Sequence, residues 1–237
     1  MAKRVPEGPP PAPVVQRLRL QYAKRGRLRF TSSRDFQRAL ERAIRRAQIP
    51  IAFSAGFHPH PRISYANAAA TGTASEAEFF ELALQRECDP EQVRVALDEA
   101  LPEGLDIVRV VVAGAGSLAD GLQASSWKLE FEGVASGELA RAVLRLMQQE
   151  RVEVTRMMKS GPRTFDVRSA IRHADVQGAQ LLMTLEHTTP AVRPDDVLTA
   201  LRQAAAFEPQ RSPLVTRLEQ GVLDQDAQLL DPLAARD

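Results

Sequence analysis

The sequence contains a single cysteine, Cys88, among its 237 residues. One chain can therefore form neither a disulfide framework nor a cysteine-rich zinc or iron–sulfur site. Long apolar runs are also missing, since none approaches the roughly 18 residues that a membrane-spanning helix needs. The first four residues, Met-Ala-Lys-Arg, lead into prolines instead of an apolar segment, so no secretory signal is expected. These absences favour a soluble cytoplasmic protein without membrane contact.

Acidic residues are scarce in the first 65 positions, which hold 14 lysines and arginines against three acidic residues, a net charge of +11. The rest of the chain carries −10, so the overall charge of +1 conceals a strong asymmetry. A basic segment of this kind favours an anionic partner, most commonly nucleic acid. The alternative is a solvated surface, because arginine outnumbers lysine 27 to 4 and some of these arginines only keep the surface hydrated.

Hydrophobic periodicity predicts six elements in the first half of the chain. Apolar residues recur at helical spacing from Ser33 to Ala47, with Ser32 as the expected N-cap and Asp35 in the first turn. A second helix is expected at 90–101, and strands are expected at 17–22 continuing after a turn at 27–30, and at 62–66, 77–84 and 105–112. The order β-α-β-β-α-β is the ferredoxin-like pattern.

A similar order recurs after a predicted linker at 114–123. Helices are expected at 138–149 and 194–205, and strands at 127–131, 152–158, 164–171, 180–186 and 214–223. We therefore predict an α+β fold of two tandem ferredoxin-like (β-α-β-β-α-β) domains. The predicted parts are a flexible tail at 1–13, a basic domain at 14–113, a second domain at 124–225 and a flexible tail at 226–237.

Arginines gather on two neighbouring elements near the N-terminus. One edge of the predicted helix carries them at spacings of four and three, with one more beside it: Arg34, Arg38, Arg42, Arg45 and Arg46. The preceding strand alternation adds five on two faces: Arg17, Arg19, Arg25, Arg27 and Arg29. Only Asp35 and Glu41 lie among these ten arginines, which favours a phosphate-binding surface, whereas an isolated helix would be explained by solvation alone. Arginine also stacks on bases, so RNA suits the composition at least as well as DNA.

Residues 53–65, FSAGFHPHPRISY, concentrate polar and aromatic groups in a chain that is only 5% aromatic. We name its first part, residues 53–62, the His-Pro loop. His58 and His60 could bind a metal, act as acid and base, or hydrogen-bond a phosphate. A metal would lack a third ligand nearby, apart from Asp35 or Glu78. The segment could equally be a polar binding loop or a purely structural loop that caps the preceding helix.

Three stretches carry a family resemblance: RLRFTSSRDF at 27–36, SAGFHPHPRISYA at 54–66, and residues 72–81. They resemble the bacterial radical-SAM-linked protein family, a domain of unknown function found alone or fused behind a radical SAM enzyme domain. Members are typically encoded near a radical SAM protein, an E/G-type ribonuclease and large-subunit ribosomal proteins, so the resemblance implies a radical SAM protein as partner in trans. The family usually has histidine where Ser33 stands, so any chemistry of that histidine would be missing here.

The sequence lacks the Cys-x₃-Cys-x₂-Cys motif of radical SAM enzymes, so the chain is not itself such an enzyme, and no cofactor is expected. Three functions remain open. The first is an accessory RNA-binding module that works with a radical SAM protein in RNA or ribosome-related modification or processing. The second is a protein-interaction subunit of that enzyme without RNA contact. The third is an endoribonuclease that uses His58 and His60, with Asp35 orienting one imidazole.

The RNA-binding reading assigns contacts to the arginine edge and to the His-Pro loop with its following strand. The predicted RNA-binding residues are Arg27, Arg29, Arg34, Arg38, Arg42, Arg45, Phe57, His58, His60, Arg62 and Tyr65.

Overall fold

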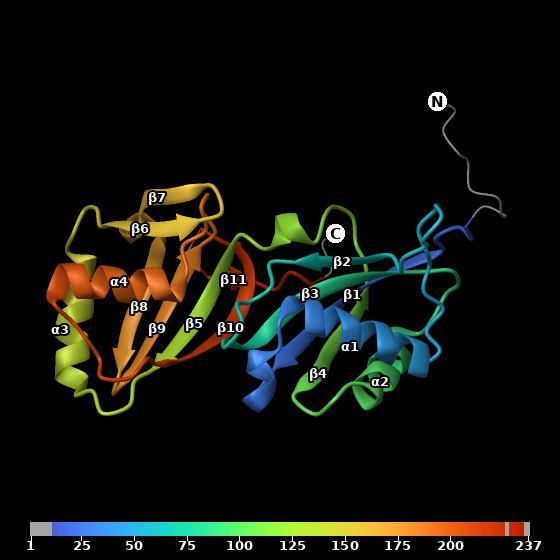
Figure 1. Ribbon diagram of the computed structural model, residues 1–237, viewed down its shortest axis with the longest axis horizontal. Helices are drawn as coiled ribbons and strands as arrows, with labels where there is room; N and C mark the ends of the chain where they lie inside the picture. Colours follow the sequence, from blue (N-terminus) through green and yellow to red (C-terminus); the bar gives the residue numbers. More distant parts are fainter. Residues whose placement is uncertain (1–10, 226–227, 235–237) are drawn as a thin grey trace. The chain divides into compact units, whose positions relative to one another are not determined.

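The structure, a computed structural model, describes residues 11–225 and 228–234, which divide into two compact units (Figure 1). Unit 1 comprises the described residues through Thr71, Ala77–Leu118 and those from Leu233 on; unit 2 comprises Gly72–Glu76 and Ala119–Pro232. The described residues contain four α-helices, a mixed nine-stranded sheet and a separate hairpin, which confirms the predicted α+β class. Among these residues, no helix combines the length and the apolar character needed to span a bilayer.

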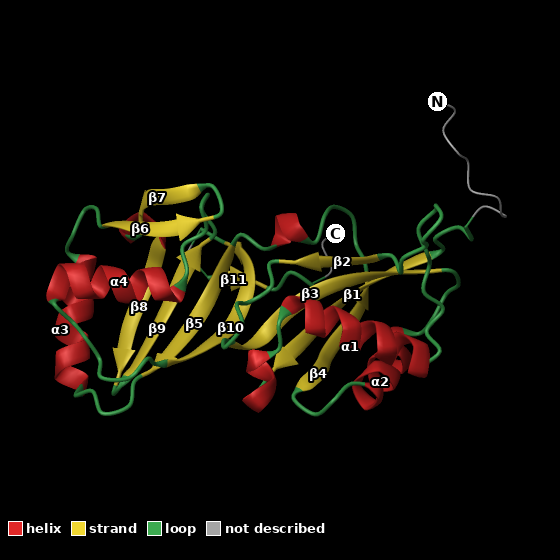
Figure 2. Cartoon of the chain, viewed as in Figure 1, coloured by secondary structure: helices red, strands yellow, loops and turns green. Residues whose placement is uncertain are grey.

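Unit 1 follows the predicted order of elements. They are β1 (Gln16–Lys24), the 3₁₀ helix η1 (Gly26–Phe30), α1 (Ser33–Arg46), β2 (Ile63–Ala66), β3 (Ala74–Leu84), α2 (Pro90–Ala100) and β4 (Leu105–Val112). The strands lie in the order β4-β1-β3-β2. Phe36 and Leu40 of α1 and Leu97 of α2 join strand residues in one core, so both helices cover the same face of these strands (Figure 2).

Helix α1 begins where the sequence predicts it. The Ser32 hydroxyl accepts the backbone N–H of Asp35 at 3.2 Å and donates to the Asp35 carboxylate at 2.7 Å. This reciprocal cap satisfies an otherwise unpaired N–H at the helix start and contributes about 1 kcal/mol. Asp35 therefore has a structural role at the N-terminus of α1.

The predicted strand continuation at 27–30 is wrong, because this segment forms η1. Gly26 adopts a positive φ of 52°, which turns the chain out of the sheet, and Leu28 N–H and Thr31 N–H then bond to the carbonyls of Arg25 and Leu28. Leu28 packs against the core of unit 1. A single partly buried residue in a 3₁₀ turn gives the same apolar-polar alternation as a short strand, and the sequence pattern alone could not separate the two.

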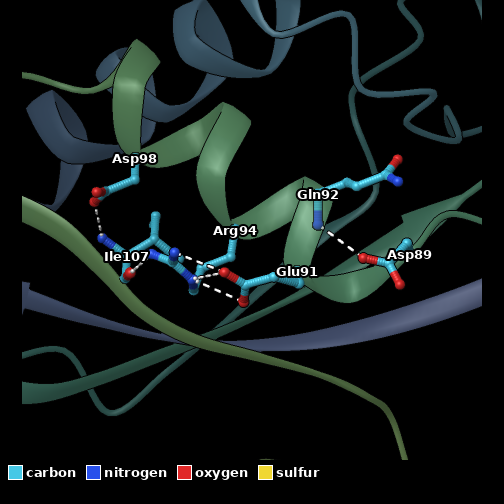
Figure 3. A network of polar contacts seen from close by, with 6 residues as sticks. All are labelled: Asp89, Glu91, Gln92, Arg94, Asp98 and Ile107. Carbon is cyan, nitrogen blue, oxygen red and sulfur yellow. Dashed lines mark hydrogen bonds and ion pairs between the residues drawn. The ribbon is translucent and has the colours of Figure 1, made fainter.

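Strand β4 is the edge strand of the sheet in unit 1. Side chains of α2 form hydrogen bonds with its backbone (Figure 3). Asp98 accepts the N–H of Ile107 at 2.7 Å, and Arg94 donates to the Ile107 carbonyl at 3.5 Å. Glu91 holds Arg94 in an ion pair of 2.7 Å, which lowers the pKa of the Glu91 carboxyl through its hydrogen bond to the guanidinium. These contacts protect an edge that could otherwise pair with another chain.

Unit 2 has an inserted hairpin between its first helix and its second sheet strand. The elements are η2 (Ala119–Gly121), β5 (Ala124–Glu130), α3 (Ser136–Met147), β6 (Glu153–Met158), β7 (Gly161–Asp166), η3 (Arg168–Ala170), β8 (Ile171–Gln177), β9 (Gln180–Glu186), α4 (Pro194–Ala205), β10 (Leu214–Leu223) and β11 (Leu229–Leu230). The main strands lie in the order β10-β5-β9-β8, while β6 and β7 pair with each other. Residues Ala74 and Ser75, which start β3 but belong to unit 2, pair in parallel with β10.

The predicted strand at 164–171 is also wrong, because it is broken between β7 and β8. The Asp166 carboxylate accepts the backbone N–H groups of Val152, Arg168 and Ser169. Burial opposes the charged form, but these hydrogen bonds together lower the pKa of Asp166. They turn the chain into η3, and β8 then follows as a strand that the sequence analysis missed.

The predicted linker and the described part of the predicted C-terminal tail make defined contacts. In the predicted linker, Arg19 donates to the carbonyls of Gly114 at 3.2 Å and Gly116 at 2.5 Å. In the predicted C-terminal tail, β11 pairs with β10, an approach that Gly221 permits because a Cβ there would lie 1.9 Å from the Leu230 carbonyl oxygen. The predicted tail positions 1–10, 226–227 and 235–237 lie outside the described residues.

A buried polar cluster joins the ends of three segments in unit 2. The Ser125 hydroxyl lies 2.6 Å from Nε2 of His187, and Nδ1 of His187 lies 2.7 Å from the Leu122 carbonyl, which can only accept. Ser125 is fully buried, so this pair is not a nucleophile and base open to a substrate. Burial lowers the pKa of His187, with the hydrogen bond to Leu122 acting in the opposite direction.

The lowered pKa of His187 predicts acid sensitivity in unit 2. Because the folded state binds this proton more weakly than the unfolded chain, stability should decrease as the pH falls below about 6.5, the ordinary histidine value, until the lower folded pKa is passed. Thermal melting of the wild type and His187→Gln between about pH 8 and pH 5 measures the effect. The wild type should lose more melting temperature over this range than the variant. An equal loss in both proteins would contradict the assignment.

Candidate functional site

The arginines of α1 lie on the face opposite its buried residues. Arg34, Arg38, Arg42 and Arg45 are all exposed, whereas Phe36, Leu40, Ala43 and Ile44 are buried. With Arg27 and Arg29 of η1 they form what we name the arginine surface. The predicted α1 stripe is thus brought onto one helix face. Arg46 is also exposed, but its guanidinium donates to the Ala100 carbonyl at 3.3 Å and helps to join α1 to α2.

The arginines of β1 and the turn after it have a different role. Arg17 and Arg19 share one carboxylate, that of Glu81 on β3, at 2.9 Å and 3.3 Å. Arg25 pairs with Asp106 at 2.7 Å. These arginines are therefore neutralised by acidic residues of the neighbouring strands and stabilise the sheet.

The arginine surface lacks such compensation. Arg38 lies 3.9 Å from Asp35, and both side chains are largely exposed, so this ion pair is weak. Within the part of the chain that the structure describes, Arg34, Arg42 and Arg45 have no ion pair with any carboxylate. The guanidinium groups of these three arginines are left to solvent, and their charges are available to an anionic partner.

An exposed phenylalanine lies at the start of the arginine surface. Phe30, the last residue of η1, is 59% exposed, and the guanidinium of Arg29 lies over its ring at 4.6 Å from the centroid. Phe30 is not among the site residues predicted from the sequence, because the strand predicted at 27–30 would put its ring on a sheet face. The signal in the sequence was its position directly after Arg29 and four residues before Arg34, in a chain with few aromatic residues.

Tyr65 on β2 borders α1 through aromatic contacts. Its ring lies 6.3 Å from that of Phe36, edge to face, and Phe36 in turn stacks on Tyr22 at 4.1 Å. The side chain is 37% exposed. Burial of the phenol raises the pKa of Tyr65 well above its ordinary value, and the nearby charge of Glu41 on α1 adds to the effect. Tyr65 is therefore a neutral hydrogen-bonding group next to α1.

The His-Pro loop is a hydrogen-bonded turn with an exposed tip. Phe53 and Pro61 form an antiparallel bridge at its base, and Ser54 and His60 are joined by two hydrogen bonds, from Ser54 N–H to the His60 carbonyl and from His60 N–H to the Ser54 hydroxyl. Gly56 has a φ of +125°, which other residues rarely adopt, and allows the tight reversal. Phe57 at the tip is 62% exposed.

The structure does not bring the predicted catalytic residues together. The side chains of His58 and His60 are exposed, and no hydrogen bond to either imidazole is found among the described residues, so nothing orients them as acid and base. Asp35 is engaged in the cap of α1. In Figure 1 the chain leaves the C-terminal end of α1 and rises to the point where β2 begins. The His-Pro loop therefore lies beyond this end of α1 and not along the helix.

A metal ion has no cluster of ligands among the described residues of this region. The described residues contain no group of three or more histidine, cysteine, aspartate or glutamate side chains arranged to hold a metal ion. Arg62, the last residue of the His-Pro loop, is exposed, and its backbone bonds to Ala52 and Ala83. The loop is thus anchored to β3 and presents its tip to solvent.

Comparison with known proteins identifies a family. No curated protein matches the chain. A family model matches residues 17–194, which include the arginine surface, the His-Pro loop and all of unit 2 up to the start of α4. Its description mentions no radical SAM protein, so that association stays a prediction. The match spans well over half of the sequence, and the chain therefore belongs to the bacterial family described as an uncharacterized protein conserved in bacteria, DUF2344.

Proposed function

We propose that the protein is an accessory RNA-binding module whose arginine surface contacts the phosphate backbone. The observation that carries this proposal is that Arg34, Arg42 and Arg45 are exposed on one helix without a carboxylate partner among the described residues. Arginines with a purely structural role in this unit, Arg17 and Arg25, do have such partners. Phosphates would replace the water and counterions now around the guanidinium groups, and counterion release favours such binding.

RNA is favoured over DNA by the groups that accompany the arginines. Single-stranded RNA is recognised by stacking of bases on aromatic and guanidinium planes, and by hydrogen bonds to base edges and hydroxyl groups. Phe30 and Arg29 supply such planes at one end of α1, and the Tyr65 phenol lies along its side. A B-form major groove would instead need a helix with base-reading side chains, and α1 presents mainly arginines.

The proposal extends to the fold of the two units. The strand orders β4-β1-β3-β2 and β10-β5-β9-β8 are those expected of a ferredoxin-like sheet, with β6 and β7 as an insertion in unit 2. Two tandem ferredoxin-like units are therefore the interpretation that these orders support. This topology occurs in many proteins that bind RNA, but it also carries unrelated functions, so it adds little to the RNA argument.

A radical SAM protein is the second element of the proposal, as a partner in trans. The resemblance of the His-Pro loop to the radical-SAM-linked family motivates it, and the hydrogen-bonded loop with its exposed Phe57 supports it. A preformed loop loses little conformational entropy on binding, and an aromatic residue at its tip suits a pocket of a protein partner. The endoribonuclease reading has no comparable support, because the exposed imidazoles of His58 and His60 are not oriented and Asp35 is engaged in the helix cap.

Charge reversal on α1 should strongly weaken RNA binding. In Arg38→Glu/Arg42→Glu, two positive groups become negative, so the affinity for total cellular RNA should fall at least about ten-fold at low salt. The dependence of log affinity on log salt should also become shallower by about 0.7 for each phosphate of a single strand that the variant no longer neutralises. Fluorescence anisotropy over a salt series measures both quantities.

The matched control is Arg141→Glu/Arg145→Glu on α3, two exposed arginines with the same four-residue spacing in unit 2. Circular dichroism confirms that both double variants are folded. RNA affinity that is equally reduced in both variants, or unchanged in the α1 variant, contradicts the proposed surface.

Truncation of the loop tip should weaken the complex with the proposed radical SAM partner. In Phe57→Ala the partner pocket loses its aromatic anchor, and the dissociation constant should rise about ten-fold or more. Nuclease-treated proteins are compared by co-purification and biolayer interferometry, so that RNA cannot bridge them. Leu144→Ala, which removes a similarly exposed apolar side chain from α3, serves as control. Separate elution of the wild-type proteins at micromolar concentration and low salt excludes the partner.

A further inference from the structure

We infer that Phe30 is a stacking platform for an unpaired base, so that the arginine surface selects single-stranded over duplex RNA. This inference rests on the proposed RNA-binding function and names the substrate class of the same surface. Nothing in the family description or in the predicted site residues assigns a role to Phe30.

Because Phe30 is exposed, a contact with a ligand explains its position better than packing does. Its side chain lies outside the hydrophobic core of unit 1, although its neighbour Leu28 packs against that core. The hydrogen bonds of η1, from Leu28 N–H to Arg25 and from Thr31 N–H to Leu28, fix the backbone on both sides of this leucine. The ring is therefore held outward by an ordered turn, so that little conformational freedom is lost when a flat apolar partner binds.

Arg29 prepares the ring for stacking. Its guanidinium lies over one face of Phe30 at 4.6 Å from the ring centroid, and Phe30 is nevertheless 59% exposed. A base that stacks on the opposite face would complete a layer of guanidinium, phenyl ring and base. Both contacts are favourable, since π faces attract cations and aromatic rings stack on any base.

The phosphates of the same strand have a continuous path from this platform. Arg34 follows Phe30 by four residues, and Arg38, Arg42 and Arg45 extend along α1. At 1.5 Å per residue, each four-residue step covers about 6 Å. A flexible single strand can follow this row while one base turns onto Phe30. A duplex keeps its bases stacked on each other, so it can use the arginines but not the phenyl ring.

The test compares two RNA probes, a labelled unstructured uridine-rich strand of about twelve nucleotides and a duplex of the same length. In Phe30→Ala, affinity for the single strand should fall about ten-fold, the size expected for one base–aromatic stack, and affinity for the duplex should not change. The salt dependence should stay that of the wild type, because no ionic contact is removed. Leu144→Ala, a 58% exposed apolar residue on α3, controls for loss of exposed apolar surface.

A second variant reports the stack directly. Phe30→Trp should keep the affinity for the single strand, and RNA binding should quench the emission of the introduced indole. The one native tryptophan, Trp127, is buried and lies in unit 2, so it adds a constant background.

The outcomes distinguish a failure of RNA binding from a failure of base stacking on Phe30. If neither probe binds the wild type in a salt-dependent way, the proposed function itself fails. If both bind and Phe30→Ala matches the wild type, or weakens strand and duplex alike, the stacking inference is overturned while the arginine surface stands. An unquenched indole in the RNA-bound state overturns it as well.

Discussion

The stack of Tyr22 on Phe36 determines which face α1 turns to solvent. The two rings lie 4.1 Å apart and almost parallel, and Phe80 closes the group from β3. Such aromatic pairs contribute about 0.5–1.5 kcal/mol beyond the burial of their surface. Because Phe36 is in the first turn of α1, the stack fixes the rotation of the helix at the end where Arg34 and Phe30 lie. Every further property of the arginine surface depends on this orientation.

The second constraint is the division of charge within unit 1. Glu81 forms ion pairs with both Arg17 and Arg19 and is itself largely buried. Its carboxylate therefore pairs with arginines of the sheet and not with those of α1. Asp106 is used by Arg25 in the same way. Two acidic residues lie on α1 itself. Asp35 takes part in the helix cap, and Glu41 lies near Tyr65. Exposed arginines therefore outnumber carboxylates on this helix, although the whole chain is almost neutral.

Where one physical signal was strong, the sequence predicted the fold well. The 3.6-residue period and the Ser32–Asp35 cap placed α1, and the run of β-branched residues placed β4 at Leu105–Val112. The prediction failed where a single carboxylate or glycine sets the path of the chain, as Asp166 does before β8 and Gly26 does before η1. Such positions act through backbone geometry and leave no periodic pattern. The arginines of the site were visible in the sequence, but their division into paired and unpaired groups depends on Glu81 and Asp106, which are distant in the chain.

The error at residues 27–30 bears directly on the candidate site. In a strand, the side chains of Arg27 and Arg29 would share one face, with Leu28 and Phe30 on the other, and both apolar residues would be buried together. In η1 only Leu28 packs inward, while Phe30 and the arginines remain outside. The 3₁₀ turn thus converts a residue type that normally enters the core into an exposed ring beside a row of cations. The His-Pro loop does the same for Phe57 through Gly56, but at a place without a comparable row of arginines. A ring with cations beside it suits a base attached to a phosphate chain, whereas a ring on a rigid loop suits a protein pocket, and this difference separates the two surfaces chemically.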